Sequence, residues 1–171
     1  MRDLAGLDGV RRFMRELGRA SDCEARVYFT GGASAVLLGW RAMTIDLDIK
    51  IVSEGDAILK AIPLLKELLS LNVELASPDQ FIPPLPGWEG RSLFIAQEGR
   101  LAFHHYDFYA QALAKVERGH KQDVEDVRAM LERGLVEPGK LRGFFAAIEP
   151  ELYRFPALDA RTFRASLEGF L

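Results

Sequence analysis

The sequence predicts an α+β fold in which strands and helices alternate through the first two thirds and helices alone fill the last third. Three observations favour this fold. Short β-rich runs recur before residue 106, apolar residues at helical spacing separate them, and only helical patterns follow residue 107. A chain of 171 residues is close to the usual length of one domain. We therefore expect an α/β core over residues 1–106 and a helical segment over residues 107–171, packed together as one compact unit.

The amino-acid composition and net charge exclude several classes of protein. Hydrophobic residues make up 49% of the chain and charged residues 27%, which excludes intrinsic disorder and collagen-like order. A formal net charge of −3 argues against a general polyanion binder. The one cysteine, Cys23, excludes an intramolecular disulfide framework and a zinc site with several cysteines. No signal-peptide pattern and no run of about 18 apolar residues is present, so we expect a cytoplasmic protein that does not enter the membrane.

The first elements surround a pair of glycines. Apolar residues at three- and four-residue spacing predict a first helix from residue 8 to Gly18, which stands at a C-cap position. A β-rich strand then stops at Gly31-Gly32, and a short buried helix follows and ends at Gly39. The predicted order is strand, tight glycine turn, helix.

The later elements follow from the same periodicities. Pro63 is expected to cost its helix a hydrogen bond or to kink it. Asp107 and Asp159 are expected to cap helices, and Pro138 to open one at its first turn. The proline-rich stretch at 77–90 is predicted to be a loop. Further strands are expected over residues 26–30, 44–52, 71–76, 92–96 and 100–106, and further helices over residues 55–71, 107–117, 122–133, 138 onward and 159–170.

Two carboxylates share one face of the second predicted strand. Strand alternation puts Asp46, Asp48 and Lys50 on one face and the isoleucines and Leu47 between them on the other. The Cα atoms of the two aspartates lie about 6.6 Å apart at roughly 3.3 Å rise per residue, so their oxygens can converge on one or two hard cations. Two like charges side by side are costly unless a cation neutralises them. The pattern favours magnesium, although an Asp-x-Asp on the solvent face of an edge strand is a common alternative.

The glycine turn strengthens this interpretation. Gly31-Gly32 opens a helix whose first turn contains Ser34, so backbone N–H groups and a hydroxyl are available to hold a phosphate there. Thirteen residues separate Gly32 from Asp46, enough for one short helix and its return. The turn and the carboxylates are therefore expected to meet at the same end of the sheet. A tight strand-to-helix turn without a ligand remains the alternative.

These motifs together resemble the signature of the nucleotidyltransferase (DNA polymerase β-like) superfamily. The matching residues are Phe29-Thr30-Gly31-Gly32-Ala33-Ser34, followed by Asp46-Leu47-Asp48-Ile49. The run from Gly39 to Asp46 is similar to small bacterial members related to the toxins of type IV toxin–antitoxin (abortive infection) modules. The resemblance implies a nucleotidyltransferase-like mixed sheet flanked by helices. It also implies transfer of a nucleoside monophosphate from a nucleoside triphosphate such as ATP to a hydroxyl of an RNA, such as transfer RNA, or of a protein.

The resemblance assigns roles to particular residues. Asp46 and Asp48 would hold Mg²⁺ or Mn²⁺, and a third acid on a neighbouring strand would help to activate the attacking hydroxyl. Glu74 is the candidate, because strand alternation points it away from the core; a surface glutamate is the alternative. Residues expected to contact the nucleotide are Gly31, Gly32, Ser34, Arg41, Lys50, Lys115 and Arg118.

A second element comes from the helical segment. Lys115, Arg118 and Lys121 follow at three-residue spacing, with Asp123 and Asp126 behind them. The resemblance to the toxin-related group implies that Lys115 reaches the nucleotide phosphates and that Asp123 orients basic side chains or forms ion pairs with them. The alternative is a solvated face of mixed charge. The same resemblance implies a cognate antitoxin as a partner.

Two other functions stay open on sequence alone. A binding module on the same fold would hold a nucleotide or a partner without transfer. Asp-x-Asp also begins the haloacid-dehalogenase phosphatases, but Lys50 stands where those enzymes have Thr or Val, and the glycine turn precedes the pair.

Three further features are weaker signals. His104 and His105 are neighbours in a strand and point to opposite faces, so they predict no zinc site. An arginine cluster on the first helix fits a solvated face better than an RNA-binding patch. Trp88, in the proline loop, could stack a base or anchor the loop. The arginines of that cluster are Arg11, Arg12, Arg15 and Arg19.

Overall fold

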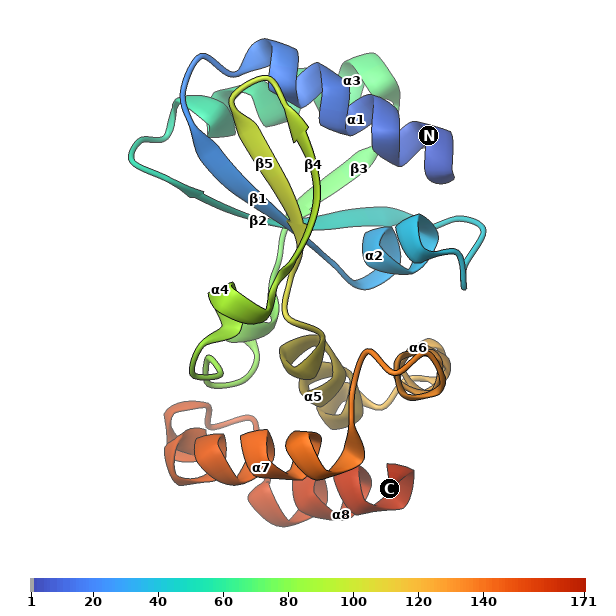
Figure 1. Cartoon of the computed structure of the whole chain (residues 1–171), viewed down its shortest axis with the longest axis vertical. Coiled ribbons are helices and arrows are strands. Elements are labelled where there is room, and N and C mark those ends of the chain that lie inside the picture. The colour runs from blue at the N-terminus through green and yellow to red at the C-terminus, as the bar shows by residue number, and fades with distance from the viewer. Residues whose placement is uncertain (1) are drawn as a thin grey trace. The chain divides into compact units, whose positions relative to one another are not determined.

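The computed structural model describes residues 2–171 and confirms the α+β class, with a five-stranded mixed sheet flanked by helices (Figure 1). Contacts divide the chain into two compact units. The sheet unit comprises the residues up to Ser77 together with Ser92–His105. The helical unit comprises Pro78–Arg91 and Tyr106–Leu171, so the proline-rich segment groups with the C-terminal helices.

The sheet unit contains all five strands, in the order β3-β2-β1-β5-β4. β1 pairs antiparallel with β2 and parallel with β5, β2 pairs parallel with β3, and β4 and β5 form an antiparallel hairpin. Its elements are α1 (Leu7–Ala20), β1 (Ala25–Thr30), α2 (Gly31–Leu38), β2 (Asp46–Ser53), η1 (Ala57–Lys60), α3 (Ala61–Leu69), β3 (Asn72–Leu75), β4 (Leu93–Glu98) and β5 (Leu101–His105).

The hydrophobic core of the sheet unit lies on one face of the sheet. The apolar side chains that alternate along the three central strands are almost fully buried with those of α1, α2 and α3. Strand alternation therefore leaves the polar side chains of the same strands on the opposite face. The buried strand residues are Val27, Phe29, Leu47, Ile49, Leu101 and Phe103.

Gly18 is not a helix end, contrary to the sequence prediction. α1 continues to Ala20, and Gly18 lies inside it against the β4–β5 turn. A Cβ at Gly18 would lie 2.6 Å from the backbone oxygen of Glu98. Because only glycine permits this approach, its absent side chain serves packing rather than capping.

The predicted helix over residues 55–71 is shorter than expected and begins with a 3₁₀ turn, η1. Pro63 lies in the first turn of α3, where the backbone N–H groups have no intrahelical acceptor, so it costs no helical hydrogen bond. β3 is a short edge strand, and its last residue, Leu75, is 50% exposed.

The helical unit follows the predicted boundaries closely. Asp107 caps α5 by accepting from the Tyr109 N–H, and Asp159 caps α8 by accepting from the Thr162 N–H, as predicted. Two short helices lie in the segment predicted to be a loop. The elements are η2 (Pro78–Gln80), α4 (Trp88–Arg91), α5 (Phe108–Arg118), α6 (Lys121–Glu132), α7 (Pro138–Ile148), η3 (Glu149–Arg154) and α8 (Ala160–Phe170). Across residues 2–171, none of the helices has both the length and the apolar character needed to cross a bilayer.

Candidate active site

Three acidic residues lie together on the polar face of the sheet unit. Asp46 and Asp48 alternate with buried Leu47 on β2, as the sequence predicts. β3 runs parallel to β2 in a register that sets Glu74 directly beside Asp48. Directly paired residues point to the same face, so the two strands bring three carboxylates to one surface.

Asn72 links two of these acids. Its register partner is Asp46, and its side-chain amide donates to Asp46 Oδ1 and, over 3.0 Å, to Glu74 Oε1. A neutral amide therefore sits between two carboxylates, where it orients them without cancelling their charge. Sequence reasoning did not assign Asn72 to the site; its position two residues before Glu74 on the same strand face was the available signal.

The glycine turn meets the carboxylates, as the spacing predicts. Thr30, the last residue of β1, is the register partner of Asp48. Gly31 follows with a φ of +57°, and a Cβ built there would lie 3.3 Å from Asp48 Oδ2. The carboxylate of Asp48 thus lies against the first turn of α2, where glycine supplies both the left-handed backbone and the space.

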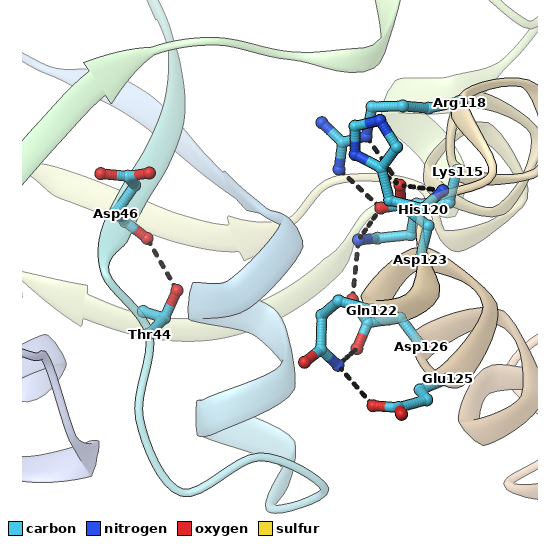
Figure 2. Close-up of polar contacts among 9 residues, drawn as sticks. All are labelled: Thr44, Asp46, Lys115, Arg118, His120, Gln122, Asp123, Glu125 and Asp126. Atoms are coloured by element: carbon cyan, nitrogen blue, oxygen red, sulfur yellow. Dashed lines mark hydrogen bonds and ion pairs between the residues drawn. The ribbon is translucent and has the colours of Figure 1, made fainter.

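Gly32 makes room for two polar side chains. A Cβ at Gly32 would lie 2.0 Å from Thr44 Oγ1 and 2.9 Å from Arg41 Nη1. The Thr44 hydroxyl also donates to the backbone oxygen of Asp46 over 3.1 Å, as Figure 2 shows. The structure therefore places the predicted Arg41 guanidinium at the glycine turn and adds Thr44, which the sequence did not single out. An anionic group bound at the turn would meet both a helix N-terminus and a guanidinium.

The Ser34 side chain lies in the interior of the sheet unit. Its hydroxyl is fully buried, donates to the Phe29 carbonyl over 3.3 Å and lies 2.9 Å from His105 Nδ1. Burial, with a smaller effect from the charge of His104, lowers the pKa of His105 to about 4. A neutral His105 therefore supports Ser34, and through it the start of α2. We assign the Ser34 hydroxyl to positioning of the glycine turn rather than to phosphate contact.

Lys50 shares the acidic face of β2. It is half-buried and pairs in register with Tyr28, two residues along the strands from the Thr30–Asp48 pair. A cation beside two carboxylates partly offsets their repulsion.

The donor set suits a hard cation that a substrate helps to bind. Among residues 2–171, no three His, Cys, Asp or Glu side chains are grouped so that they could hold a metal ion by themselves. Mg²⁺ is commonly held by one or two carboxylates together with substrate phosphates and water, rather than by an all-protein cage. Asp46 and Asp48, beside a turn suited to phosphates, fit that mode of binding.

The helical unit contains a separate cluster of charges, drawn in Figure 2. Lys115 Nζ on α5 lies 2.7 Å from Asp126 and 3.4 Å from Asp123, both on α6. Arg118 donates twice to Asp123, over 2.8 and 2.5 Å. Asp123 also accepts from the His120 backbone N–H at the start of α6. Opposite charges are thus matched across two helices.

The ion pairs of this cluster are largely buried and join α5 to α6. The side chains of Lys115, Asp123 and Asp126 are 8% exposed or less, so the alternative of a solvated face of mixed charge is wrong for Lys115, whereas Lys121 is exposed as that alternative expects. Burial alone would raise the pKa of Asp123, but the hydrogen bonds and charge of Arg118 and the charge of Lys115 hold it below its ordinary value. The ion-pairing predicted for Asp123 is confirmed. Arg118 differs in keeping 56% of its side chain exposed, while contact of Lys115 with phosphates stays a prediction.

The structure shows the surroundings of the two adjacent histidines, of Trp88 and of the arginines of α1. His104 and His105 point to opposite faces, as predicted: His104 stacks on Tyr28 and His105 contacts Ser34. Trp88 stacks on Tyr106, with ring centroids 4.4 Å apart and planes inclined by 7°, so it anchors the proline-rich segment. The arginines of α1 are exposed, and Arg19 pairs with Glu16.

Comparison with known proteins identifies the family. Residues 5–165 match the sequence model of a family described as "Nucleotidyltransferase of unknown function (DUF6036)". The chain belongs to this family. Membership supports a transferase that acts on a nucleotide, and it agrees with the resemblance carried by the glycine turn and the paired aspartates. Searches of curated proteins and of solved structures returned no match.

Proposed function

We propose that the protein is a magnesium- or manganese-dependent nucleotidyltransferase that moves a nucleoside monophosphate from a nucleoside triphosphate to a hydroxyl of an RNA, such as transfer RNA, or of a protein. The observation that carries the proposal is the meeting of Asp48, Glu74 and the Gly31-Gly32 turn on one face of the sheet. Membership of a nucleotidyltransferase family supports the reaction class.

Each part of the face has a task in this reaction. Asp46 and Asp48 would hold the cation, which stabilises charge on the phosphoryl oxygens and lowers the pKa of the acceptor hydroxyl. The backbone N–H groups of the glycine turn and the Arg41 guanidinium would bind the phosphates and keep the α-phosphorus in line with the acceptor. Electrostatic stabilisation and positioning supply most of the rate in phosphoryl transfer.

Glu74 would accept the proton. The acceptor oxygen forms a bond to the α-phosphorus while the bond to the bridging oxygen breaks, and pyrophosphate leaves with that electron pair. The proton of the acceptor hydroxyl passes to the Glu74 carboxylate, which its register places beside Asp48. Glu74 is exposed, so it can return the proton to solvent.

The biological setting follows from the resemblance alone. Similarity to toxins of type IV modules suggests a toxin-like activity with a cognate antitoxin partner. Expression of the wild type should then slow growth of the host cell, and expression of the Asp46→Ala/Asp48→Ala variant should not.

Two features favour a second candidate, a module that binds a nucleotide or a partner without transfer. The described acids do not form a group of three that could hold a metal by themselves, and Glu74 stands where the resemblance to the superfamily implies an aspartate in many members. Such a module would bind nucleoside triphosphate through the same glycine turn but release it unchanged.

Transfer of label separates the two candidates. The purified chain is incubated with Mg²⁺ and each of the four nucleoside triphosphates labelled at the α-phosphate, together with total cellular RNA or protein. The proposal expects label in one acceptor class with the wild type and none with Asp46→Ala/Asp48→Ala. Nucleotide binding without label in any acceptor would contradict transfer and favour the binding module.

A further inference from the structure

A row of three rings crosses the sheet on the face that carries the carboxylates. Register pairs Tyr28 with Lys50 on one side and with His104 on the other, and pairs His104 with Phe94. The Tyr28 and His104 rings stack with centroids 5.3 Å apart. Phe94 meets His104 edge-on at 5.6 Å and 76°. The row therefore runs from β1 across β5 to the edge strand β4.

The row ends in an accessible ring. Tyr28 is 1% exposed, whereas Phe94 is 60% exposed. A large apolar ring on an edge strand is a site for unwanted association, so its presence calls for a reason. The β4–β5 register shifts between Phe94 and Ala96, an irregularity of the kind that re-aims side chains beside functional sites.

The ring shares its surface with the candidate active site. The Thr30–Asp48 pair lies two residues along the strands from the row, on the same face. Three strand spacings and this offset put Phe94 about 16 Å from Asp48. Lys50 continues the row on β2 as the register partner of Tyr28, and Arg26 lies on the same face two residues along β1 from Tyr28, on the side away from Thr30. Aromatic rings beside cations are the combination that binds bases and phosphates of single-stranded nucleic acid.

We propose that Phe94, braced by His104, is a stacking site for a nucleobase. The identity of the ligand rests on the proposed function, because that function brings a nucleotide and a candidate RNA to this face. Every base has a π-face, so one rigid ring can bind without selecting sequence. Burial, more than the nearby charge of Arg26, lowers the pKa of His104, so the brace is uncharged near neutral pH. The base belongs either to the nucleoside triphosphate or to a single-stranded RNA acceptor.

The test replaces the ring and leaves the fold intact. Phe94→Leu keeps apolar area and removes the π-face, Phe94→Tyr restores it, and Phe81→Leu is the matched control at another phenylalanine that is 52% exposed. Circular dichroism establishes that each variant is folded. Affinities are measured with Mg²⁺ for the four nucleoside triphosphates, for inorganic triphosphate, which has no base, and for a labelled single-stranded RNA 12-mer.

The proposal expects Phe94→Leu to weaken binding of either the nucleoside triphosphates or the RNA about tenfold. Inorganic triphosphate should bind unchanged, Phe94→Tyr should bind as the wild type does, and Phe81→Leu should have no effect. The ligand whose binding is weakened identifies the source of the base. Wild-type affinity of Phe94→Leu for both ligands would overturn the stacking site and leave the proposed function standing. If the wild type binds neither ligand, both proposals fail.

Discussion

The sheet unit and the helical unit use acidic residues in opposite ways. In the sheet unit, Glu74 stands directly beside Asp48, so like charges are neighbours on a partly exposed face. In the helical unit, Asp126 and Asp123 are buried against Lys115, so opposite charges are neighbours in the interior. Like charges in direct cross-strand pairs destabilise a sheet, whereas a buried ion pair must stay matched to be tolerated. The first arrangement suits a ligand, and the second holds helices together.

Asp48→Asn should have the largest effect on activity. The change removes a charge from the candidate cation site while keeping the shape of the side chain, so label transfer should fall at least about a hundredfold. Rates of transfer are compared with those of the wild type at saturating Mg²⁺. Wild-type rates in Asp48→Asn would remove this residue from the site.

Asp126→Asn should have the largest effect on stability. Neutralising Asp126 leaves Lys115 buried with less negative charge around it, and breaking a buried pair costs about 3–5 kcal/mol. Urea denaturation measures the change in the free energy of unfolding. Arg142→Ala, which breaks an exposed pair with Glu168, is the control and should lower the free energy of unfolding far less. Equal losses in the two variants would show that burial does not distinguish the cluster.

As pH falls, protonation of His105 should lower the free energy of unfolding at a higher pH than protonation of Asp123 does. His105 has a pKa of about 4 when folded and 6.5 as its ordinary value, so the unfolded chain takes up a proton first as pH falls. Stability should therefore decline from about pH 6.5 to pH 4 by about 3 kcal/mol, since one pKa unit is worth about 1.4 kcal/mol. The depressed pKa of Asp123 acts at lower pH: its contribution to stability is present above the ordinary pKa of 3.8 and is lost as pH falls through the lower pKa of the folded protein.

His105→Gln isolates the first of these two transitions. The variant lacks the titrating ring, so its free energy of unfolding should vary less between pH 6.5 and 4 than that of the wild type. The same pH slope in both proteins would assign the acid sensitivity to another group.

Glu74→Gln should have the smallest effect on stability. The substitution removes the like-charge pair with Asp48, so the free energy of unfolding should stay the same or rise by about 0.2–1 kcal/mol. Transfer should nevertheless fall, because the variant has no carboxylate to accept the proton. A marked loss of stability would show that Glu74 supports the fold instead.

Local patterns were enough to predict much of the fold and the central motif. Alternation of polar and apolar residues placed Asp46, Asp48 and Glu74 on one face, because that periodicity is a property of the strand itself. Capping chemistry located the starts of α5 and α8, because Asp107 and Asp159 act within their own turns.

Features that depend on distant segments were missed or misread. Gly18 has the local appearance of a helix end, but its role is set by a hairpin 80 residues later in the chain. Ser34 looks like a phosphate ligand until β5 brings His105 to its hydroxyl. The closeness of Arg41 and Thr44 to Gly32 depends on how the chain returns from α2 to β2, which spacing alone does not determine.

Ligand-dependent stabilisation tests the central claim most directly: the carboxylate face of the sheet unit binds a nucleoside triphosphate with Mg²⁺. Thermal unfolding of the wild type and of Asp46→Ala/Asp48→Ala is followed with each nucleoside triphosphate, with Mg²⁺ or with EDTA. We expect a rise in Tm for the wild type that needs both Mg²⁺ and nucleotide, because a ligand bound only by the folded state stabilises it, and no such rise for the variant. An equal rise in the variant, or a rise that is unchanged in EDTA, would contradict the claim.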